Sequence, residues 1–101
     1  MTASTEQATV ADLTAFQRDL LRLLANADDR KGTALKEDLA SYYGEEINHS
    51  RLYQNLDTLA EHDLVTKRRR DRRTNEYGLT DAARDALARR DEWIAGDESD
   101  D

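Results

Sequence analysis

Apolar residues in the first two thirds of the chain recur every three or four positions, which is the spacing of one face of an α-helix. Polar segments interrupt this pattern twice. We therefore expect three helices, over residues 14–26, 33–44 and 48–63. The third carries the clearest apolar stripe, because Leu52, Leu56 and Leu59 follow the i, i+4, i+7 spacing.

After the third predicted helix, apolar residues occur at every second position. Residues 64–66 and 74–79 alternate apolar and polar side chains, and the segment between them is rich in turn-forming and charged residues. These two segments are expected to pair as a β-hairpin. Thr80 suits the N-cap of a fourth helix over residues 81–95, and Gly96 suits its end.

This order of elements favours one fold class, mainly α with a small β-hairpin. It is the winged helix-turn-helix, made of three helices, a two-stranded wing and a C-terminal helix. A plain three-helix bundle would leave the alternating segments unexplained. With 101 residues, the chain suits a single domain. We place it at residues 12–95, between a disordered N-terminal segment at 1–11 and an acidic, disordered tail at 96–101.

Positive charge is concentrated at the tip of the predicted hairpin. Residues 67–73 contain six basic side chains in a chain whose formal net charge is -7. Residues 65–77 together carry +4, so the remainder of the chain sums to -11. A chain this acidic repels polyanions nearly everywhere else, so this segment is where a nucleic-acid backbone would dock.

The choice of charged residues points to a saline environment. Twelve of the 15 basic residues are arginine, and Asp outnumbers Glu by 14 to 8. A surface rich in Asp and poor in Lys resembles those of proteins from salt-in halophiles, whereas the plainer interpretation is an ordinary acidic protein with an acidic tail. In a halophile, binding to DNA would have to survive salt that weakens most electrostatic association.

Several classes of function find no support in the sequence. Cysteine is absent, which excludes disulfides, thiolate metal sites and thiol catalysis. No apolar segment is long enough to span a membrane, and the N-terminus lacks the pattern of a signal peptide, so we expect a cytoplasmic protein. No catalytic grouping appears, and six aromatic residues are few for lining a ligand pocket. Glu45, Glu46 and His49 are better explained as solvated side chains near a helix start than as metal ligands. We expect no enzyme activity, no cofactor, no metal and no small-molecule ligand.

The third helix and the hairpin resemble the PadR family of winged-helix transcriptional regulators. Members typically carry a Leu-Tyr-Pro-x-Leu-x-x-Leu-x-x-x-Gly-Leu-[Val/Ile] signature. The positions that match are Leu52, Tyr53, Leu56, Leu59, Leu64 and Val65. Residues 77–80, Tyr-Gly-Leu-Thr, are similar to the Tyr-x-Leu-Thr that closes the family's wing. Together with the charge composition, the resemblance indicates a haloarchaeal type. Gln54 replaces the common Pro, and Asp63 replaces the usual Gly after the helix.

The resemblance implies that the third helix, over residues 48–62, is a recognition helix. N-terminal residues of such a helix reach base edges in the major groove. The candidates displaced from the apolar stripe are His49, Ser50, Arg51, Gln54 and Asn55. Arg suits guanine, and Gln or Asn suits adenine. Tyr53 is more often a core or hinge aromatic, although its hydroxyl group is able to reach a phosphate. The plainer alternative is a solvated helix face.

In the wing, the cations expected to contact phosphates or the minor groove are Lys67, Arg68, Arg70, Arg72 and Arg73. A solvated charge run is the usual explanation for such a segment. Six cations at one hairpin tip repel each other and contribute nothing obvious to folding, which favours the DNA contact. Alternation allows only some of residues 67–70 to point the same way, and the sequence leaves open which. Asp71 is expected to organise the turn.

Large apolar residues near the end of the fourth helix suggest a homodimer. Trp93 and Ile94 have little domain left to cover them, so they either pack back on the first helix or contact a second copy. The full set assigned to the dimer interface is Phe16, Leu20, Leu24, Leu87, Trp93 and Ile94.

We therefore predict a sequence-specific regulator of double-stranded DNA, a repressor acting as a homodimer. Its recognition helix enters the major groove, and its Arg-rich wing at residues 67–73 contacts the backbone or minor groove. Two alternatives stay open. One is a winged-helix module whose wing binds an acidic protein partner, and the other is a nonspecific architectural DNA binder.

Overall fold

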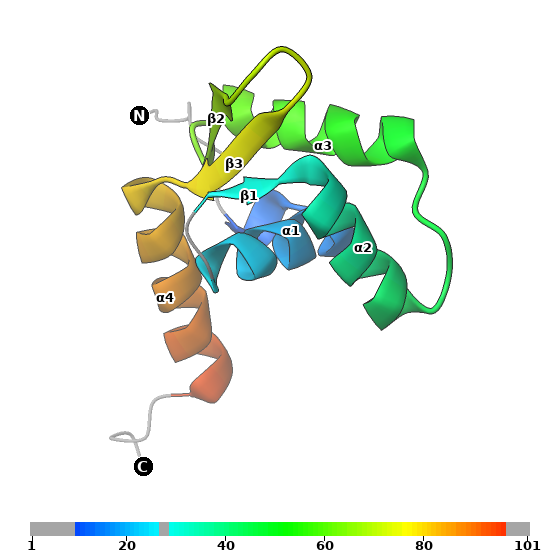
Figure 1. Ribbon diagram of the computed structural model, residues 1–101. Coiled ribbons are helices and arrows are strands. Elements are labelled where there is room, and N and C mark those ends of the chain that lie inside the picture. The colour runs from blue at the N-terminus through cyan, green and yellow to red at the C-terminus, as the bar shows by residue number, and fades with distance from the viewer. Residues whose placement is uncertain (1–9, 27–28, 97–101) are drawn as a thin grey trace.

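The computed structural model describes residues 10–26 and 29–96 (Figure 1). Most of the two segments predicted to be disordered lies outside these residues. The described elements are η1 (Val10–Asp12), α1 (Ala15–Ala25), β1 (Arg30–Lys31), α2 (Gly32–Tyr43), α3 (His49–Glu61), β2 (Val65–Arg69), β3 (Asn75–Leu79) and α4 (Asp81–Ala95). The winged helix-turn-helix class is confirmed, with a third strand in addition to the predicted hairpin.

Side chains at the predicted helix starts satisfy the first backbone N–H groups. Thr14 and Gln17 form a reciprocal capping box at α1. The side chain of Asn48 accepts a hydrogen bond from the Arg51 N–H at 2.8 Å, and Thr80 accepts one from Ala83. The starts of α1, α3 and α4 were therefore predictable from local sequence, whereas α2 begins at Gly32, one residue before its predicted start, and has no side-chain cap.

Two turns require a left-handed backbone. Gly44, which ends α2, has a φ of 73°. Asp63, which follows α3, has a φ of 63° and is the one described residue other than glycine with a positive φ. Asp occupies this conformation at lower cost than most side chains, which is why it is able to replace the glycine expected here.

The sheet has three antiparallel strands in the order β1-β3-β2. In the hairpin, Lys67 lies opposite Tyr77 and Arg68 opposite Glu76. The strand β1 was not predicted, because two residues are too few to show an alternating pattern. It exists through its pairing with β3, where Arg30 lies opposite Tyr77.

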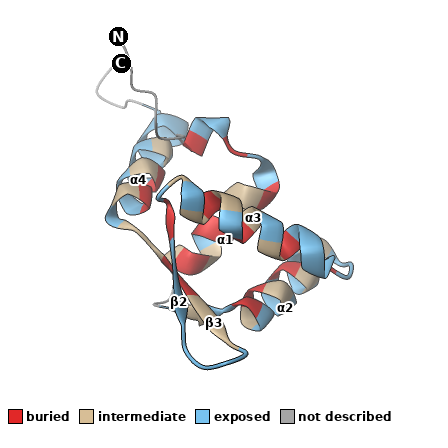
Figure 2. Ribbon diagram, turned by 90° about the horizontal axis from the view of Figure 1, so that it is seen from above, coloured by how far each residue is buried: buried red, intermediate tan, exposed pale blue. Residues whose placement is uncertain are grey.

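A single apolar core lies between α1, the other helices and the sheet (Figure 2). The fully buried side chains are Leu20, Leu21, Leu24, Leu35, Leu39, Leu52, Leu56, Leu59 and Tyr77. Val10 is buried as well, so the folded domain begins before residue 12, within the segment expected to be disordered. The hairpin projects from this core, and its tip is exposed (Figure 2).

The helix α4 packs against this body through its first half. Ala83 and Leu87 are buried, and Arg22 of α1 forms an ion pair with Asp91. Beyond Asp91 the helix leaves the core: Trp93 is 75% exposed and Ile94 is 58% exposed. Of the two interpretations that the sequence left open, packing of these residues back on α1 is therefore not observed.

Candidate nucleic-acid interface

The N-terminal half of α3 presents a polar surface opposite its buried leucines. His49, Ser50, Arg51 and Gln54 are all exposed, while Leu52, Leu56 and Leu59 are buried. The predicted division between a core face and an outer face is therefore observed. Because Ser50 and Gln54 lie one helical turn apart, they share one side of the helix. Such a surface is able to meet base edges or phosphates.

Arg51 has a specific resting position within this surface. Its guanidinium carbon lies 4.0 Å from the centroid of the Phe16 ring of α1. Arginine in this geometry is attracted by the negative face of the ring. The contact leaves Arg51 exposed, so its guanidinium donors remain available to a ligand.

Asn55 has a structural role that the sequence did not reveal. Its amide nitrogen donates to the Arg51 carbonyl at 2.7 Å, and its side-chain oxygen accepts from Gln17 at 2.9 Å. Since Gln17 also caps α1, Asn55 connects α3 to the start of α1. These two hydrogen bonds use one N–H donor and one acceptor site of the Asn55 amide and hold its side chain against α1.

Tyr53 is a half-buried packing residue, as its sequence context favoured. Its ring lies 4.5 Å from that of His49 and 6.4 Å from that of Tyr77, measured between centroids. It also packs directly on Gly32, where an added Cβ would lie 2.2 Å from the tyrosine oxygen. Tyr53 thus joins α3 to the sheet and to the start of α2.

Lys67 connects the wing to α3. Its ammonium group lies 3.1 Å from a carboxylate oxygen of Asp57, on the outer side of α3. The hydrogen bond to Asp57 is the main reason that the pKa of Lys67 is raised. Because Lys67 lies opposite the buried Tyr77, it shares the sheet face that packs on α3.

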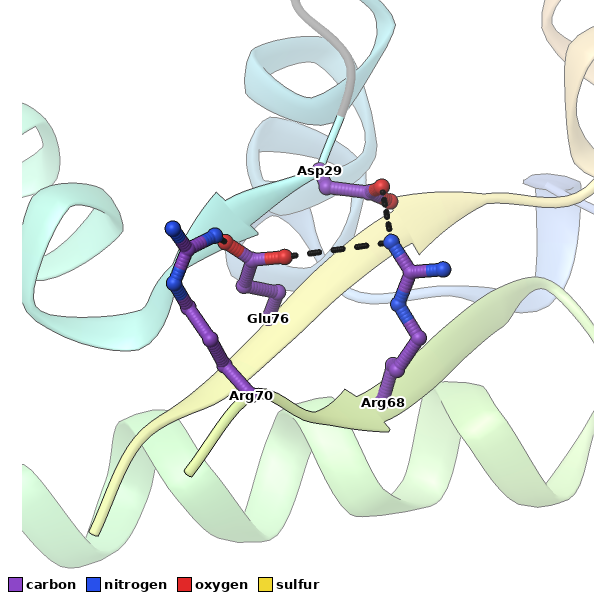
Figure 3. A network of polar contacts seen from close by, with 4 residues as sticks. All are labelled: Asp29, Arg68, Arg70 and Glu76. Carbon is purple, nitrogen blue, oxygen red and sulfur yellow. Dashed lines mark hydrogen bonds and ion pairs between the residues drawn. The ribbon is translucent and has the colours of Figure 1, made fainter. Parts of the chain in front are cut away.

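Arg68 lies on the other face of β2, and Arg70 directly follows this strand; carboxylates contact both side chains (Figure 3). Arg70 contacts Glu76 at 2.5 Å, and Arg68 contacts Asp29 at 3.0 Å and Glu76 at 4.0 Å. Figure 3 shows Glu76 between the two arginine side chains. Alternation along β2 sends Lys67 toward α3 and Arg68 away from it. Arg70 follows the strand and contacts Glu76, as Arg68 does.

The wing tip holds the remaining cations. A carboxylate oxygen of Asp71 accepts a hydrogen bond from the Arg73 N–H at 2.9 Å, which is the main reason that the pKa of Asp71 is lowered. Asp71 therefore organises the turn, as predicted. Within residues 10–26 and 29–96, the wing cations without a carboxylate partner are Arg69, Arg72 and Arg73. Arg69 was not among the wing residues predicted to contact DNA.

A further cation lies beside the start of α3. An open hollow of about 390 Å³ is lined by Lys36, Glu46, Ile47, Asn48 and His49. Lys36 comes from α2 and was missed, because one lysine in an amphipathic helix has no distinguishing pattern. No group of three or more potential metal ligands occurs among the described residues, and none of the described helices is long and apolar enough to cross a membrane.

The residues assigned to a dimer interface divide into two groups. Phe16, Leu20, Leu24 and Leu87 are buried within one chain, where they form its own core. This corrects their assignment, since a side chain enclosed by its own domain is not open to a partner. Trp93 and Ile94 remain exposed and available.

Comparison with known proteins agrees with this geometry. The sequence profile of the Transcriptional regulator PadR-like family matches residues 20–89. A structure of RosR from H. salinarum, grown from NaBr, is 51% identical and has a TM-score of 0.79, covering 82% of this chain and 74% of that chain. The complex structure of hsRosR-S1 is 50% identical and has a TM-score of 0.80, covering 83% of this chain and 74% of that chain.

A more distant structure shares the fold alone. A cysteine-to-serine mutant of Lactococcus lactis ZitR is 22% identical and has a TM-score of 0.59, covering 98% of this chain and 73% of that chain. Comparison with curated proteins finds no match.

Proposed function

Because the chain belongs to the PadR-like family of transcriptional regulators, we propose that it acts as a homodimeric repressor that reads DNA sequence through α3. The resemblance noted at residues 48–65 and 77–80 is confirmed at the level of the family, and the chain is a DNA-binding transcription regulator. Repression, dimerisation and the placement of each element on DNA are the proposal.

One observation carries the proposal: the exposed polar side of α3 lies beside the cationic wing. The Lys67–Asp57 contact fixes β2 next to α3. A duplex whose major groove receives α3 would therefore also meet the wing. Two surfaces of this kind are suited to separate tasks, since base edges specify sequence and phosphates position the protein.

Within α3, Arg51 and Gln54 are the residues best placed to read bases. Both are exposed near the helix N-terminus. Arg matches the O6 and N7 acceptors of guanine, and Gln matches N6 and N7 of adenine, with about 1–3 kcal/mol of discrimination for each good pair. Ser50 and His49 flank them and supply further donors. Tyr53 and Asn55 support this surface from behind through their contacts with Gly32 and Gln17.

The wing is proposed to contact the flanking backbone or the minor groove. Arg72 and Arg73 at its tip are exposed and have no carboxylate partner among the described residues, as is also the case for Arg69. Guanidinium groups bind phosphates through paired N–H donors. Each such contact strengthens binding without adding sequence preference.

The acidic remainder of the chain suits this function to high salt. The chain carries 22 acidic residues and is about half identical to RosR of H. salinarum. Screening at molar salt reduces the contribution of phosphate contacts, with a Debye length of about 3 Å at 1 M. Base contacts of α3 then supply a larger share of the affinity.

A second copy is proposed to bind through the end of α4. Trp93 and Ile94 expose large apolar groups on a helix that leaves the core. A two-fold dimer would place two copies of α3 on half-sites roughly 34–36 Å apart, or a multiple of that distance.

The test is fluorescence anisotropy of the full chain with a duplex from upstream of its own gene and with a scrambled duplex, over a KCl series that reaches molar concentrations. Preferential binding that persists at high salt supports a specific regulator. Equal binding to both duplexes that disappears with salt indicates a nonspecific architectural binder. Absence of DNA binding together with capture of an acidic protein would favour the protein-interaction module.

A further inference from the structure

Glu76 is a shielded carboxylate beneath two exposed guanidinium groups. Its side chain is 11% exposed, whereas those of Arg68 and Arg70 are 69% and 58% exposed. One carboxylate oxygen faces Arg68 and the other faces Arg70, at 4.0 and 2.5 Å. The negative charge therefore lies under the arginines, and the positive groups face outward (Figure 3).

Arg68 of β2 and Arg70, which directly follows the strand, are two residues apart and contact the same carboxylate of Glu76. That separation corresponds to roughly 7 Å along a strand. This is close to the distance between successive phosphates of one DNA strand. Each guanidinium has five N–H donors, of which contact with Glu76 occupies only part, so the others are able to bind a phosphate at the same time.

Asp29 completes the arrangement from the opposite edge of the sheet. It contacts Arg68 at 3.0 Å and lies over Gly78, where an added Cβ would be 2.7 Å from its carboxylate oxygen. The absence of a side chain at Gly78 thus leaves room for the carboxylate. Arg68 is held from two sides, by Asp29 and Glu76.

We propose that Glu76, assisted by Asp29, is a positioning residue that holds Arg68 and Arg70 as a two-pronged clamp for consecutive phosphates of one DNA strand. The inference rests on the proposed function. It adds a second contact with the DNA backbone, on the face of the wing turned away from α3. The clamp binds phosphate without regard to base sequence.

The alternative is that the carboxylates compete with phosphate for the arginines. Competition requires that the ion pairs break before DNA binds, and it predicts that removing a carboxylate strengthens binding. The shielded position of Glu76 argues against this alternative, because a phosphate approaching from solvent meets the outward guanidinium donors first. The two accounts therefore differ in the sign of one measurable effect.

The experiment introduces Glu76→Gln into two backgrounds. One is the wild-type chain, and the other is the double variant Arg68→Gln/Arg70→Gln. Fluorescence anisotropy with a labelled duplex of scrambled sequence reports backbone binding alone. We expect Glu76→Gln to weaken binding on the order of fivefold in the wild-type background, although it removes a negative charge. In this variant, the slope of log affinity against log salt concentration should become shallower by about one.

In the background without the two arginines, Glu76→Gln should leave the affinity for DNA unchanged or raise it. The substitution then only removes the negative charge of Glu76, which repels the phosphates. A rise in the wild-type background would overturn the proposal in favour of competition. An equal loss in both backgrounds would also overturn it, because it would show that Glu76 acts only through folding.

Asp29→Asn provides a second variant on an exposed side chain, in case Glu76→Gln unfolds the wing. It should weaken binding by a smaller factor, and an increase would contradict the proposal. Glu61→Gln, which removes an exposed carboxylate from α3, is the matched control for charge and should not weaken binding. If the wild-type chain binds neither this duplex nor the upstream duplex, the proposed function itself fails.

Discussion

The guanidinium of Arg51 rests on the ring of Phe16, with its central carbon 4.0 Å from the ring centroid. The contact joins α3 to α1, across 35 positions of sequence. Phe16 is buried, so the arginine covers part of a ring that the core would otherwise expose. Arg51 is therefore both a packing residue and a candidate reader of bases.

Replacing Arg51 by Ala should affect both stability and site preference. Loss of the contact with Phe16 is expected to lower the free energy of unfolding by about 0.5–1 kcal/mol. Loss of a guanine contact should reduce preference for the upstream duplex by about 1–3 kcal/mol. Gln54→Ala should reduce preference similarly while changing stability by less than about 0.5 kcal/mol.

These two variants are compared by urea unfolding and by competition between upstream and scrambled duplexes. Arg89→Ala removes the same charge from an exposed position on α4 and serves as the control. If Arg51→Ala and Gln54→Ala keep the full preference, α3 does not read this sequence through these side chains.

Breaking the Lys67–Asp57 contact should loosen the wing from the recognition helix. Both side chains are more than a third exposed, so Lys67→Gln is expected to lower stability by only about 0.2–1 kcal/mol. Its effect on DNA affinity should be larger, because it removes a cation and leaves the Asp57 charge uncompensated near the phosphates. Adding Asp57→Asn should recover part of that affinity. Anisotropy of the two single variants and the double variant measures the coupling, and strictly additive effects would argue against it.

Gly32→Ala should destabilise the fold by about 1–3 kcal/mol through overpacking. The added methyl group would lie 2.2 Å from the oxygen and 2.6 Å from the nearest ring carbon of Tyr53. Thermal and urea unfolding measure the change. The same substitution should have a smaller effect when Tyr53 is Leu, since that side chain lacks the clashing atoms. An equal effect in both backgrounds would locate the strain elsewhere.

Substitution of Trp93 and Ile94 by Ser should convert a dimer into a monomer without destabilising the domain. Both side chains are largely exposed in the single chain, so little buried area is lost within it. Light scattering coupled to size exclusion reports the mass. Tyr42→Ser is a matched control, because Tyr42 is 81% exposed on α2 and should leave the mass unchanged. A dimer that survives loss of Trp93 and Ile94 would place the interface elsewhere.

Stability should fall at alkaline pH through Tyr43. Burial, followed by its hydrogen bond to Asp19 at 2.5 Å, raises the pKa of Tyr43 to about 12, compared with about 10 in an unfolded chain. A raised pKa in the folded state contributes stability that is complete below pH of about 10. That contribution is lost as the pH rises through about 12.

Urea unfolding between pH 8 and pH 12 tests this effect. Tyr43→Phe should be less stable than the wild type by about 1 kcal/mol at neutral pH, through loss of the hydrogen bond. The difference between the two should shrink as the pH rises. A constant difference across the whole range would show that Tyr43 does not titrate with folding.

Local sequence was enough to locate the starts of α1, α3 and α4. The hydroxyl of Thr14, the amide of Asn48 and the hydroxyl of Thr80 each cap the helix expected after them. A cap depends on one side chain and the three residues that follow it, so no distant contact is needed. The left-handed conformation of Asp63 agrees with the resemblance to the family signature, in which Asp63 takes the place of a glycine.

Residues with long-range partners were harder to interpret. Asn55 was predicted to contact DNA, and the sequence did not show that its side chain also accepts a hydrogen bond from Gln17, 38 positions away. Phe16, Leu20 and Leu24 were assigned to a dimer, although they form the core of one chain. An apolar stripe on a helix shows that this face is buried, but it does not show whether the same chain or a second copy buries it.

The sequence by itself determined that this chain is a winged helix-turn-helix with six cations between residues 67 and 73. Only the tertiary structure decided how those cations are used. The carboxylates that meet Lys67, Arg68 and Arg70 come from α3, β3 and the segment before β1. Strand alternation sends adjacent residues to opposite faces. Which carboxylate lies on each face depends on the register of β2 against β3 and on the packing of α3. Charge is a local property of the sequence, whereas the pairing of charges is a property of the fold.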